Sequence, residues 1–347
     1  MEDRKNGLLQ EGEDAYRQDA AASSAPAPTF EEFGPVYVQE WLHVEDYSER
    51  TRSEYTRLLK SDVYPRFGTK RLDALTLPDI QKLKGEYLSE EVSKKTANNV
   101  LTLISQVLKY AVKAGKIATV PCTITQFDVD DAEMERYSDE VFASLVAAAA
   151  GIGTRYVVLV LLAGDAGLRR GELVGLEWTD IDFKDGVLHV RRQESRGKVG
   201  PPKGGKQRTV PMTERLKTAL QALKKSRTTT ERRVLARDAS YRWDRNQERV
   251  KDRTLQNWME LIEQSVGIEG GTGRLHILRH TFCSRLADRG VPAGHIQKLA
   301  GHASITTTER YMHYSDEGLG KAIAALDGAL APSSGALAAS WRPGPAR

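Results

Sequence analysis

The sequence has little cysteine and no long apolar run, and both absences limit the kind of protein that it can encode. Among its 347 residues there are two cysteines, Cys122 and Cys283, which lie far apart in the chain. This count argues against a disulfide scaffold and fits a reducing compartment, so we expect a cytoplasmic protein. No apolar stretch reaches the ~18 residues that a membrane-spanning helix needs. The N-terminus also lacks the basic start and apolar centre of a signal peptide.

A strong excess of one charge is also absent, but positive charge gathers in the second half of the chain. The net charge is +4, from 51 Lys and Arg against 47 Asp and Glu. Residues 186–215 carry eight Lys or Arg and two Glu, and residues 227–253 carry nine Lys or Arg and five acids. The first 29 residues carry six acids and three bases. Clustered positive charge is typical of a surface that meets a polyanion, although charge alone favours an ordinary solvated basic surface.

Composition and apolar spacing divide the chain into two folded parts, which its length allows. Apolar residues recur at helical spacing through the first part, which is predicted to be a small four-helix unit. The second part mixes helices with two short β segments, "GVLHVRR" and "KQRTVPM", joined by a turn rich in glycine and lysine. The fold class expected is therefore mainly α with a small antiparallel β-sheet. The predicted boundaries are an acidic disordered tail over 1–28, the helical unit over 29–115, a linker over 116–137, the second domain over 138–330 and a flexible tail over 331–347.

Local signals support these helices, and one segment has no evident place. Thr29 begins a capping box with Glu32, Thr76 precedes a helix with proline in its first turn, and Ser138 caps the first helix of the second domain. Gly115 is a natural end for the strongly periodic helix before it. The charged segment 227–253 follows no apolar period, so we leave its structure open.

Four short motifs carry the side chains that phosphate chemistry needs. Each has an ordinary interpretation when taken alone: a surface arginine, a basic turn between two strands, or an aromatic face of a helix. The residues are Arg169 in "GLRRGELVGL", Lys203 and Lys206 in "PPKGGKQRTVP", His276 and Arg279 in "HILRH", and His302 and Tyr311 in "AGHASITTTERYMH".

Taken together, these residue types indicate phosphoryl transfer through a protein nucleophile. The planar fork of arginine can hold the oxygens of a phosphodiester transition state without a metal ion. A tyrosine nucleophile must lose its proton, which histidine can assist, and the departing oxygen needs an acid such as lysine. The histidines of "HILRH" have no glutamate between or beside them, as zinc motifs require, so we expect no metal site.

The order and spacing of the motifs resemble the tyrosine recombinases of the phage integrase family. The resemblance covers most of residues 138–315, and the helical unit over 29–115 is similar to the core-type DNA-binding domain of that family. It implies that Arg169 and Arg279 clamp the scissile phosphate and that Lys203 protonates the leaving 5′ oxygen. It also implies that His276 and His302 assist proton movement and phosphate binding.

By the same resemblance Tyr311 is the nucleophile that forms a 3′-phosphotyrosyl bond. Tyr314, His313 and His280 fall outside the six catalytic positions, and His280 is interpreted as structural. The phosphotyrosyl link conserves the energy of the phosphodiester bond, so no ATP or other cofactor is expected.

The resemblance also implies how the protein meets DNA. The expected partner is double-stranded DNA with inverted-repeat core sites, bound by a tetramer of this chain on the nucleoid. An amphipathic helix after the nucleophile, from Leu319 to Leu330, is expected to dock on a neighbouring protomer. A helix N-terminus with basic and amide side chains suits phosphate contact and base reading, which makes Lys94, Lys95, Asn98 and Asn99 the candidate DNA-binding residues. The alternatives are a DNA-relaxing enzyme like the type IB topoisomerases and a DNA-binding regulator with a silent site.

Overall fold

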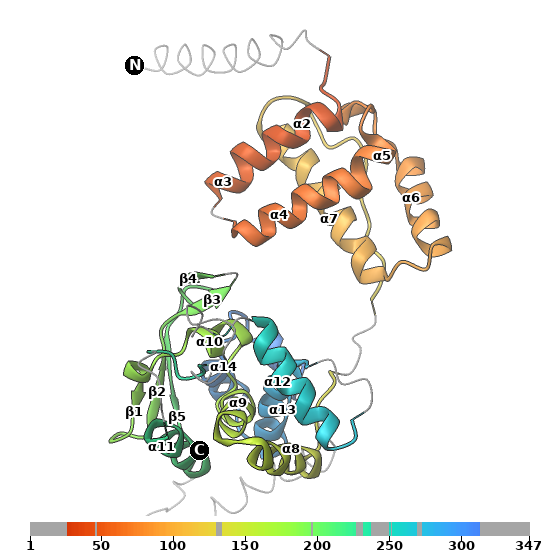
Figure 1. Ribbon diagram of the computed structural model, residues 1–347. Coiled ribbons are helices and arrows are strands. Elements are labelled where there is room, and N and C mark those ends of the chain that lie inside the picture. The colour runs from red at the N-terminus through yellow and green to blue at the C-terminus, as the bar shows by residue number, and fades with distance from the viewer. Residues whose placement is uncertain are drawn as a thin grey trace, which may run out of the picture. The chain divides into compact units, whose positions relative to one another are not determined.

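The computed structural model contains two compact, mostly helical units, which divide between Ala132 and Glu133 (Figure 1). This confirms the predicted fold class, a mainly α chain with small antiparallel sheets. The structure describes residues 26–45, 47–129, 134–195, 197–226, 232–236, 250, 252–268 and 273–312. Most of the acidic tail, the helix predicted over 319–330, and both His313 and Tyr314 lie outside these residues. Within them, no helix has the length and apolarity that crossing a bilayer requires.

The first unit contains the four predicted helical stretches, two of which run through a wider π-helical turn. The first is α2 (Phe30–Val36), η1 (Tyr37–Trp41) and α3 (Leu42–Val44), and the second is α4 (Glu49–Leu58), η2 (Leu59–Val63) and α5 (Tyr64–Phe67). After the 3-10 turn η3 (Leu72–Ala74) come α6 (Leu77–Ser89) and α7 (Lys94–Lys113).

Side-chain caps begin these helices where the sequence predicts them. The backbone N–H of Thr29 donates to Glu32 Oε2 at 2.8 Å, and Thr29 Oγ1 accepts from the N–H of Glu32 at 3.3 Å. Thr76 and Asp79 form the same reciprocal pair at the start of α6. Gly34 lies inside a helix because its lack of a side chain admits Tyr64: a Cβ there would lie 2.2 Å from the tyrosine hydroxyl oxygen.

The core of the first unit is built on α7. Its buried positions recur at three- and four-residue spacing: Ala97, Val100, Leu101, Leu103, Ile104, Val107, Leu108 and Ala111. Part of the segment expected as a linker also packs here, since Ile117 is buried in this core and Phe127 lies against it. The chain therefore stays with the first unit well beyond Gly115.

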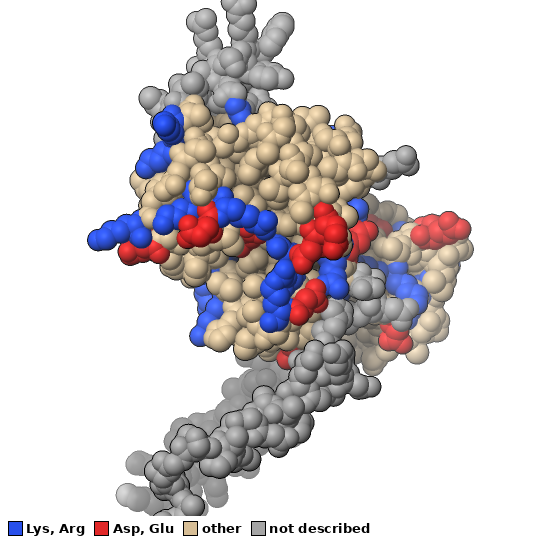
Figure 2. All heavy atoms as spheres, turned by 90° about the horizontal axis from the view of Figure 1, so that it is seen from below, with Lys and Arg blue, Asp and Glu red and all other residues tan. Residues whose placement is uncertain are grey.

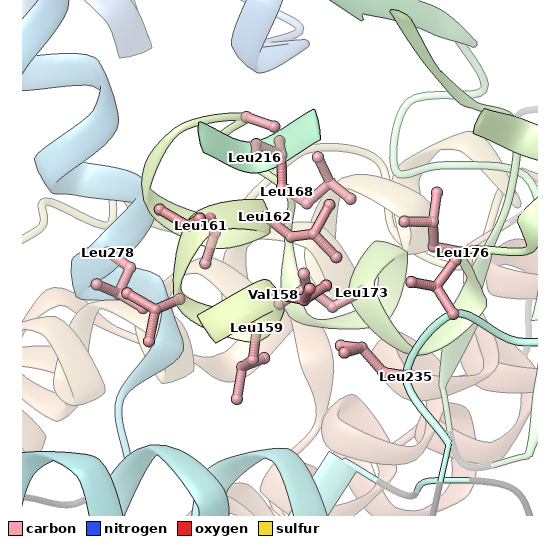
Figure 3. Close-up of a cluster of buried hydrophobic side chains, with 14 of the residues drawn as sticks. Val158, Leu159, Leu161, Leu162, Leu168, Leu173, Leu176, Leu216, Leu235 and Leu278 are labelled. Carbon is pink, nitrogen blue, oxygen red and sulfur yellow. The ribbon is translucent and has the colours of Figure 1, made fainter. Parts of the chain in front are cut away.

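The second unit is organised around the apolar helix α9. Its helices are α8 (Asp139–Ile152), α9 (Thr154–Gly164), α10 (Arg170–Gly175), η4 (Trp178–Asp180), α11 (Glu214–Lys225), α12 (Asp252–Ser265), α13 (Leu275–Asp288), α14 (Ala293–Ala300) and α15 (Thr306–Glu309). Leu161 of α9 lies beside Leu278 of α13, and Val158 of α9 lies beside Leu173 of α10 (Figure 3). Because α9 is covered on all sides, it is apolar all round rather than amphipathic, as expected of a central helix.

Two small antiparallel sheets lie between α10 and α11. The three-stranded sheet has the order β1 (Ile181–Asp182), β2 (Val187–Val190) and β5 (Arg208–Pro211), with Leu188 opposite Val210. The two predicted strands therefore do pair. The connection is longer than the simple turn that we expected, because β3 (Gln193–Ser195) and β4 (Lys198–Gly200) form a separate two-stranded ribbon within it.

Part of the charged segment that the sequence left open is buried. Residues 232–236 run beside the chain before η4, where the N–H of Trp178 donates to Arg232 O at 3.0 Å and the N–H of Val234 donates to Leu176 O at 3.0 Å. Val234 and Leu235 enter the core, and the Arg233 guanidinium forms buried ion pairs with two glutamates. The "RRVLA" stretch thus supplies a core element.

Candidate active site

Three segments that are distant in the sequence meet at the N-terminal end of α10. Arg169 immediately precedes α10, Arg279 lies on α13, and residues 300–302 form the end of α14 and the turn after it. Arg169 Nη2 donates to Gly301 O at 2.5 Å and Arg279 Nη2 donates to Ala300 O at 2.7 Å. The turn at Gly301 thus holds both guanidinium groups, and its left-handed backbone (φ 69°) favours glycine.

Arg279 is an almost completely buried cation that has no carboxylate partner among the residues that the structure describes. Its side chain also donates to Gly167 O, and burial together with Arg169 lowers its pKa to about 10. Two guanidinium groups that face each other in a poorly solvated site repel, and an anion between them would relieve that repulsion. The site is therefore electrostatically prepared for a phosphate.

A buried glutamate holds Arg169 in place. Glu172 Oε1 accepts from Arg169 Nη1 at 3.0 Å, and Arg208 of β5 donates to both Glu172 oxygens at 2.9 and 2.8 Å. Arg208 also donates to Leu299 O at 2.8 Å, which ties the sheet to α14. Burial alone would raise the pKa of Glu172, but Arg208 and Arg169 hold it below its ordinary value, so the carboxylate is charged.

Tyr311 lies among histidines and has little contact with solvent. Its side chain is 3% exposed, and its ring stacks on His302 with the centroids 5.9 Å apart and the planes at 6°. Its hydroxyl lies 2.6 Å from His280 Nδ1. Burial and the neighbouring Cys283 thiol raise the pKa of Tyr311, so the phenol is fully protonated in this state.

The two predicted histidines occupy different places around this tyrosine. His302 Nδ1 lies 2.9 Å from Thr308 Oγ1, and burial together with Arg279 lowers the pKa of His302 to about 4. His276 lies at the outer edge of the cluster, with its ring edge-on to His280 at 5.6 Å between centroids. Partial burial and Arg274 lower the pKa of His276, so both histidines are neutral near pH 7.

Lys203 lies in an exposed turn beside the site. The turn is closed by a hydrogen bond from the N–H of Gly205 to Pro202 O at 2.8 Å. A Cβ on Gly204 would lie 3.9 Å from the Cβ of Ala303, the residue after His302. The structure therefore brings the backbone of the lysine turn to the loop of the histidine and leaves the Lys203 side chain in solvent.

The candidate DNA-binding residues of the first unit cluster at the start of α7. Lys94, Lys95 and Asn99 are exposed. Asn98 differs, because its amide donates to Phe127 O at 2.9 Å and accepts from the N–H of Phe127 at 2.8 Å. Both polar atoms of Asn98 thus hold the chain that leaves this unit.

Sequence reasoning did not assign three residues of this cluster. Glu172 had a signal, since it stands three residues into the helix that follows Arg169. His280 shares a helix face with His276 but was interpreted as structural, whereas in the structure its Nδ1 lies 2.6 Å from the Tyr311 hydroxyl. Arg208 had no signal, because only the fold brings β5 to α10. Within the described residues, no group of three or more His, Cys, Asp or Glu side chains could hold a metal ion.

On the side of the second unit shown in Figure 2, basic and acidic side chains lie next to one another. Many arginines of this unit are paired with acids: Arg136 with Asp288, Arg215 and Arg285 with Asp165, and Arg289 with Asp139. Arg169 is likewise paired with Glu172, so among the described residues of the site it is Arg279 whose positive charge has no ion-pair partner.

Paired arginines, a buried tyrosine and neutral histidines are the groups that transfer of a phosphoryl group to a protein side chain needs. Comparison with known proteins specifies the family. Residues 135–317 match the phage integrase family and residues 35–126 match the phage integrase central domain. The chain belongs to the phage integrase family and is a tyrosine recombinase, an enzyme of site-specific DNA recombination.

Individual relatives agree with this assignment. The chain is 29% identical to a XerC-like tyrosine recombinase of Caldanaerobacter subterraneus subsp. tengcongensis, over 67% of this chain and 66% of that protein. It is 26% identical to tyrosine recombinase XerC of Thermodesulfovibrio yellowstonii, over 80% of this chain and 91% of that protein.

Solved structures share the fold. The Tn1549 transposon integrase in complex with transposon right end DNA has a TM-score of 0.72 at 22% identity, covering 86% of this chain and 100% of that chain. A lambda integrase tetramer bound to a Holliday junction has a TM-score of 0.64 at 19% identity, covering 87% of this chain and 82% of that chain.

Proposed function

We propose that this chain cleaves and rejoins double-stranded DNA at inverted-repeat core sites, with Tyr311 as the nucleophile. The observation that carries the proposal is the placement of the Tyr311 ring on His302, whose loop also accepts hydrogen bonds from Arg169 and Arg279. A phosphate held by the two arginines would therefore lie close to the phenol. The test is whether the purified protein forms a covalent complex with nicked duplex DNA in buffer that contains a chelator and no nucleotide. The DNA is a duplex selected from a randomised library by binding to the protein, with single nicks placed in turn across its centre.

Each residue of the cluster has a defined task in this proposal. Arg169 and Arg279 bind the non-bridging oxygens and stabilise the charge that grows on them in the transition state. Glu172 and Arg208 keep Arg169 oriented. His276 and His302 complete the polar wall of the site, from which they donate hydrogen bonds to the phosphate. The Tyr311 oxygen bonds to phosphorus as the bond to the 5′ oxygen breaks, and Lys203 gives that oxygen a proton.

The assembly proposed is a tetramer of this chain on two duplexes, acting on nucleoid DNA. The related lambda integrase forms a tetramer on a Holliday junction, which supports this arrangement. The apolar spacing from Leu319 to Leu330 is what an amphipathic docking helix needs. Docking that helix on a neighbour would link the placement of Tyr311 to assembly, because only a few residues separate them.

Replacement of Lys203 by alanine is expected to slow cleavage of a normal phosphodiester by about 10²–10⁴-fold, the usual contribution of a general acid. A substrate with a 5′-bridging sulfur should be cleaved at nearly the rate of the unaltered protein, since a thiolate leaves without a proton. Single-turnover cleavage of both substrates measures the difference. Lys206→Ala, at the other side of the two glycines, is the matched control and should cleave both substrates normally. Equal slowing of both substrates by Lys203→Ala would exclude the acid role.

The exposed start of α7 is proposed to contact DNA. Removing one phosphate contact lowers the slope of log K against log salt concentration by about 1. Lys94→Ala and Lys95→Ala should therefore each reduce this slope. Lys94→Arg and Lys95→Arg keep the positive charge and should preserve it. Asn99→Ala and Asn98→Ala should weaken specific binding with little change in slope, and Asn98→Ala should also loosen the chain at Phe127. Binding titrations at several salt concentrations test this. Unchanged affinity and slope in all four alanine variants would remove α7 from the interface.

A further inference from the structure

We propose that His280 is the base that takes the proton of Tyr311, an inference that rests on Tyr311 being the nucleophile. The resemblance to tyrosine recombinases assigns proton movement to His276 and His302 and leaves His280 without a role. In the structure, however, the hydroxyl of Tyr311 lies 2.6 Å from His280 Nδ1. The histidine that follows Arg279 in "HILRH" is therefore the one in contact with the atom that reacts.

The other groups around the hydroxyl are poor proton acceptors. The Cys283 thiol is a neighbour of Tyr311, but burial raises the pKa of Cys283 to about 11, so the thiol keeps its own proton. His302 is stacked parallel to the phenol at 6°, so its ring nitrogens point outward in the plane of the imidazole rather than at the phenol, and its Nδ1 is engaged with Thr308. His276 lies one helical turn before His280 and meets the His280 ring rather than the tyrosine.

Burial makes such an acceptor necessary. With the Tyr311 side chain 3% exposed, bulk water does not reach the hydroxyl freely, and the proton must leave through a neighbouring group. A neutral imidazole with hydrogen on Nε2 has a free lone pair on Nδ1, which is the atom facing the hydroxyl. A hydrogen bond of this length already points the proton at its acceptor.

The charges around His280 favour transfer only after DNA has bound. The groups that face it are His276 and Arg279 on its own helix, His302 after α14, Arg310 and Tyr311 after α15, and Glu135 before α8. Burial, His276 and Arg279 lower the pKa of His280 to about 4, which keeps it neutral but makes it a weak base. A phosphate bound at Arg279 would add negative charge nearby and raise the basicity of His280.

Each proton and each bond of the cleavage step has a defined donor and acceptor. The proton passes from the Tyr311 oxygen to His280 Nδ1 while that oxygen bonds to phosphorus, and the bond between phosphorus and the 5′ oxygen breaks. Lys203 supplies a proton to the 5′ oxygen. In rejoining, the 5′ hydroxyl returns a proton to the lysine and His280 returns its proton to the tyrosine.

The test is single-turnover cleavage of the selected nicked duplex by His280→Asn. Asparagine keeps an oxygen acceptor near the position of Nδ1 but does not accept a proton, so it separates placement of the tyrosine from removal of its proton. We expect a loss of about 10²-fold or more in rate at pH 7 with unchanged DNA binding. The rate of the variant should then rise about tenfold per pH unit from about pH 7 to 9, as hydroxide takes over, whereas that of the unaltered protein should be level.

Control variants make the outcome decisive. His295→Asn, on the exposed part of α14, should behave as the unaltered protein, and His276→Asn should be slower but level with pH. His280→Ala gives a second measurement, in which added imidazole should restore cleavage. A normal rate in His280→Asn, a slow rate that is level with pH, or the hydroxide dependence appearing in His276→Asn instead would each overturn the proposal. If Tyr311→Phe still forms the covalent complex, the proposed function itself fails, which is a separate result.

Discussion

Replacement of Tyr311 by phenylalanine is expected to abolish the covalent protein–DNA complex and leave DNA binding unchanged within about twofold. The buried ring keeps its stacking on His302 and loses only the hydroxyl, which leaves His280 Nδ1 without this partner. One unmatched polar group costs about 1–3 kcal/mol, which the folded protein should tolerate. Without the oxygen, however, no bond to phosphorus can form. Incubation with the nicked duplex followed by denaturing electrophoresis measures the covalent complex, and gel mobility measures binding.

Tyr314→Phe is the matched control for this experiment. The two tyrosines stand three residues apart in the sequence, so the same substitution at each tests which one reacts. The Tyr314 variant should form the covalent complex at the normal rate. A complex formed by Tyr311→Phe, or lost only in Tyr314→Phe, would show that the assignment of the nucleophile is wrong.

Replacement of Glu172 by alanine is expected to lower the free energy of unfolding by about 3–5 kcal/mol, the usual cost of removing one partner from a buried ion pair. The variant removes the carboxylate to which Arg208 donates two hydrogen bonds. Because the Arg208 side chain is only 7% exposed, water cannot replace that partner. It also frees Arg169 to turn away from the phosphate site. The rate of cleavage should fall even at temperatures where the variant is still folded, so the loss of activity is larger than the loss of folded protein. Urea unfolding and single-turnover cleavage measure the two effects.

A double variant, Glu172→Met with Arg208→Met, separates these two effects. Removing both charges leaves neither member of this ion pair buried without its partner, so most of the lost stability should return. Cleavage should stay low, because Arg169 still lacks its partner. Full recovery of cleavage in the double variant would exclude a positioning role for Glu172.

The same glutamate should contribute to the acid sensitivity of the fold. Its pKa is lower in the folded state, so its stabilising effect is present above the ordinary glutamate pKa of about 4.3 and is lost as pH falls through the folded value. Stability measured against pH should therefore fall more steeply below about pH 4.3 in the unaltered protein than in Glu172→Ala. Parallel curves would show that the carboxylate is not held in its charged form.

Local interactions explain what the sequence determined. Capping boxes at Thr29 and Thr76, the apolar spacing of α7 and the stop at Gly115 depend on residues within a few positions of one another, so each can be predicted without a fold. The motifs from Arg169 to Tyr311 are far apart, but each is short and their order is visible in the sequence, which was enough to indicate the chemistry. These features were sufficient to predict the fold class and the family.

Only the tertiary structure decided the contacts between distant segments. Arg208 reaches Glu172 because β5 packs beside α10 and α14, and no local pattern predicts which arginine of a basic strand will be buried. Residues 232–236 became a core element by backbone pairing with the chain before η4, although their neighbours are charged. His280 meets Tyr311 because the loop after α14 folds back on α13. In each case the deciding interaction joins residues 30 or more positions apart, where packing and hydrogen bonding depend on the whole fold.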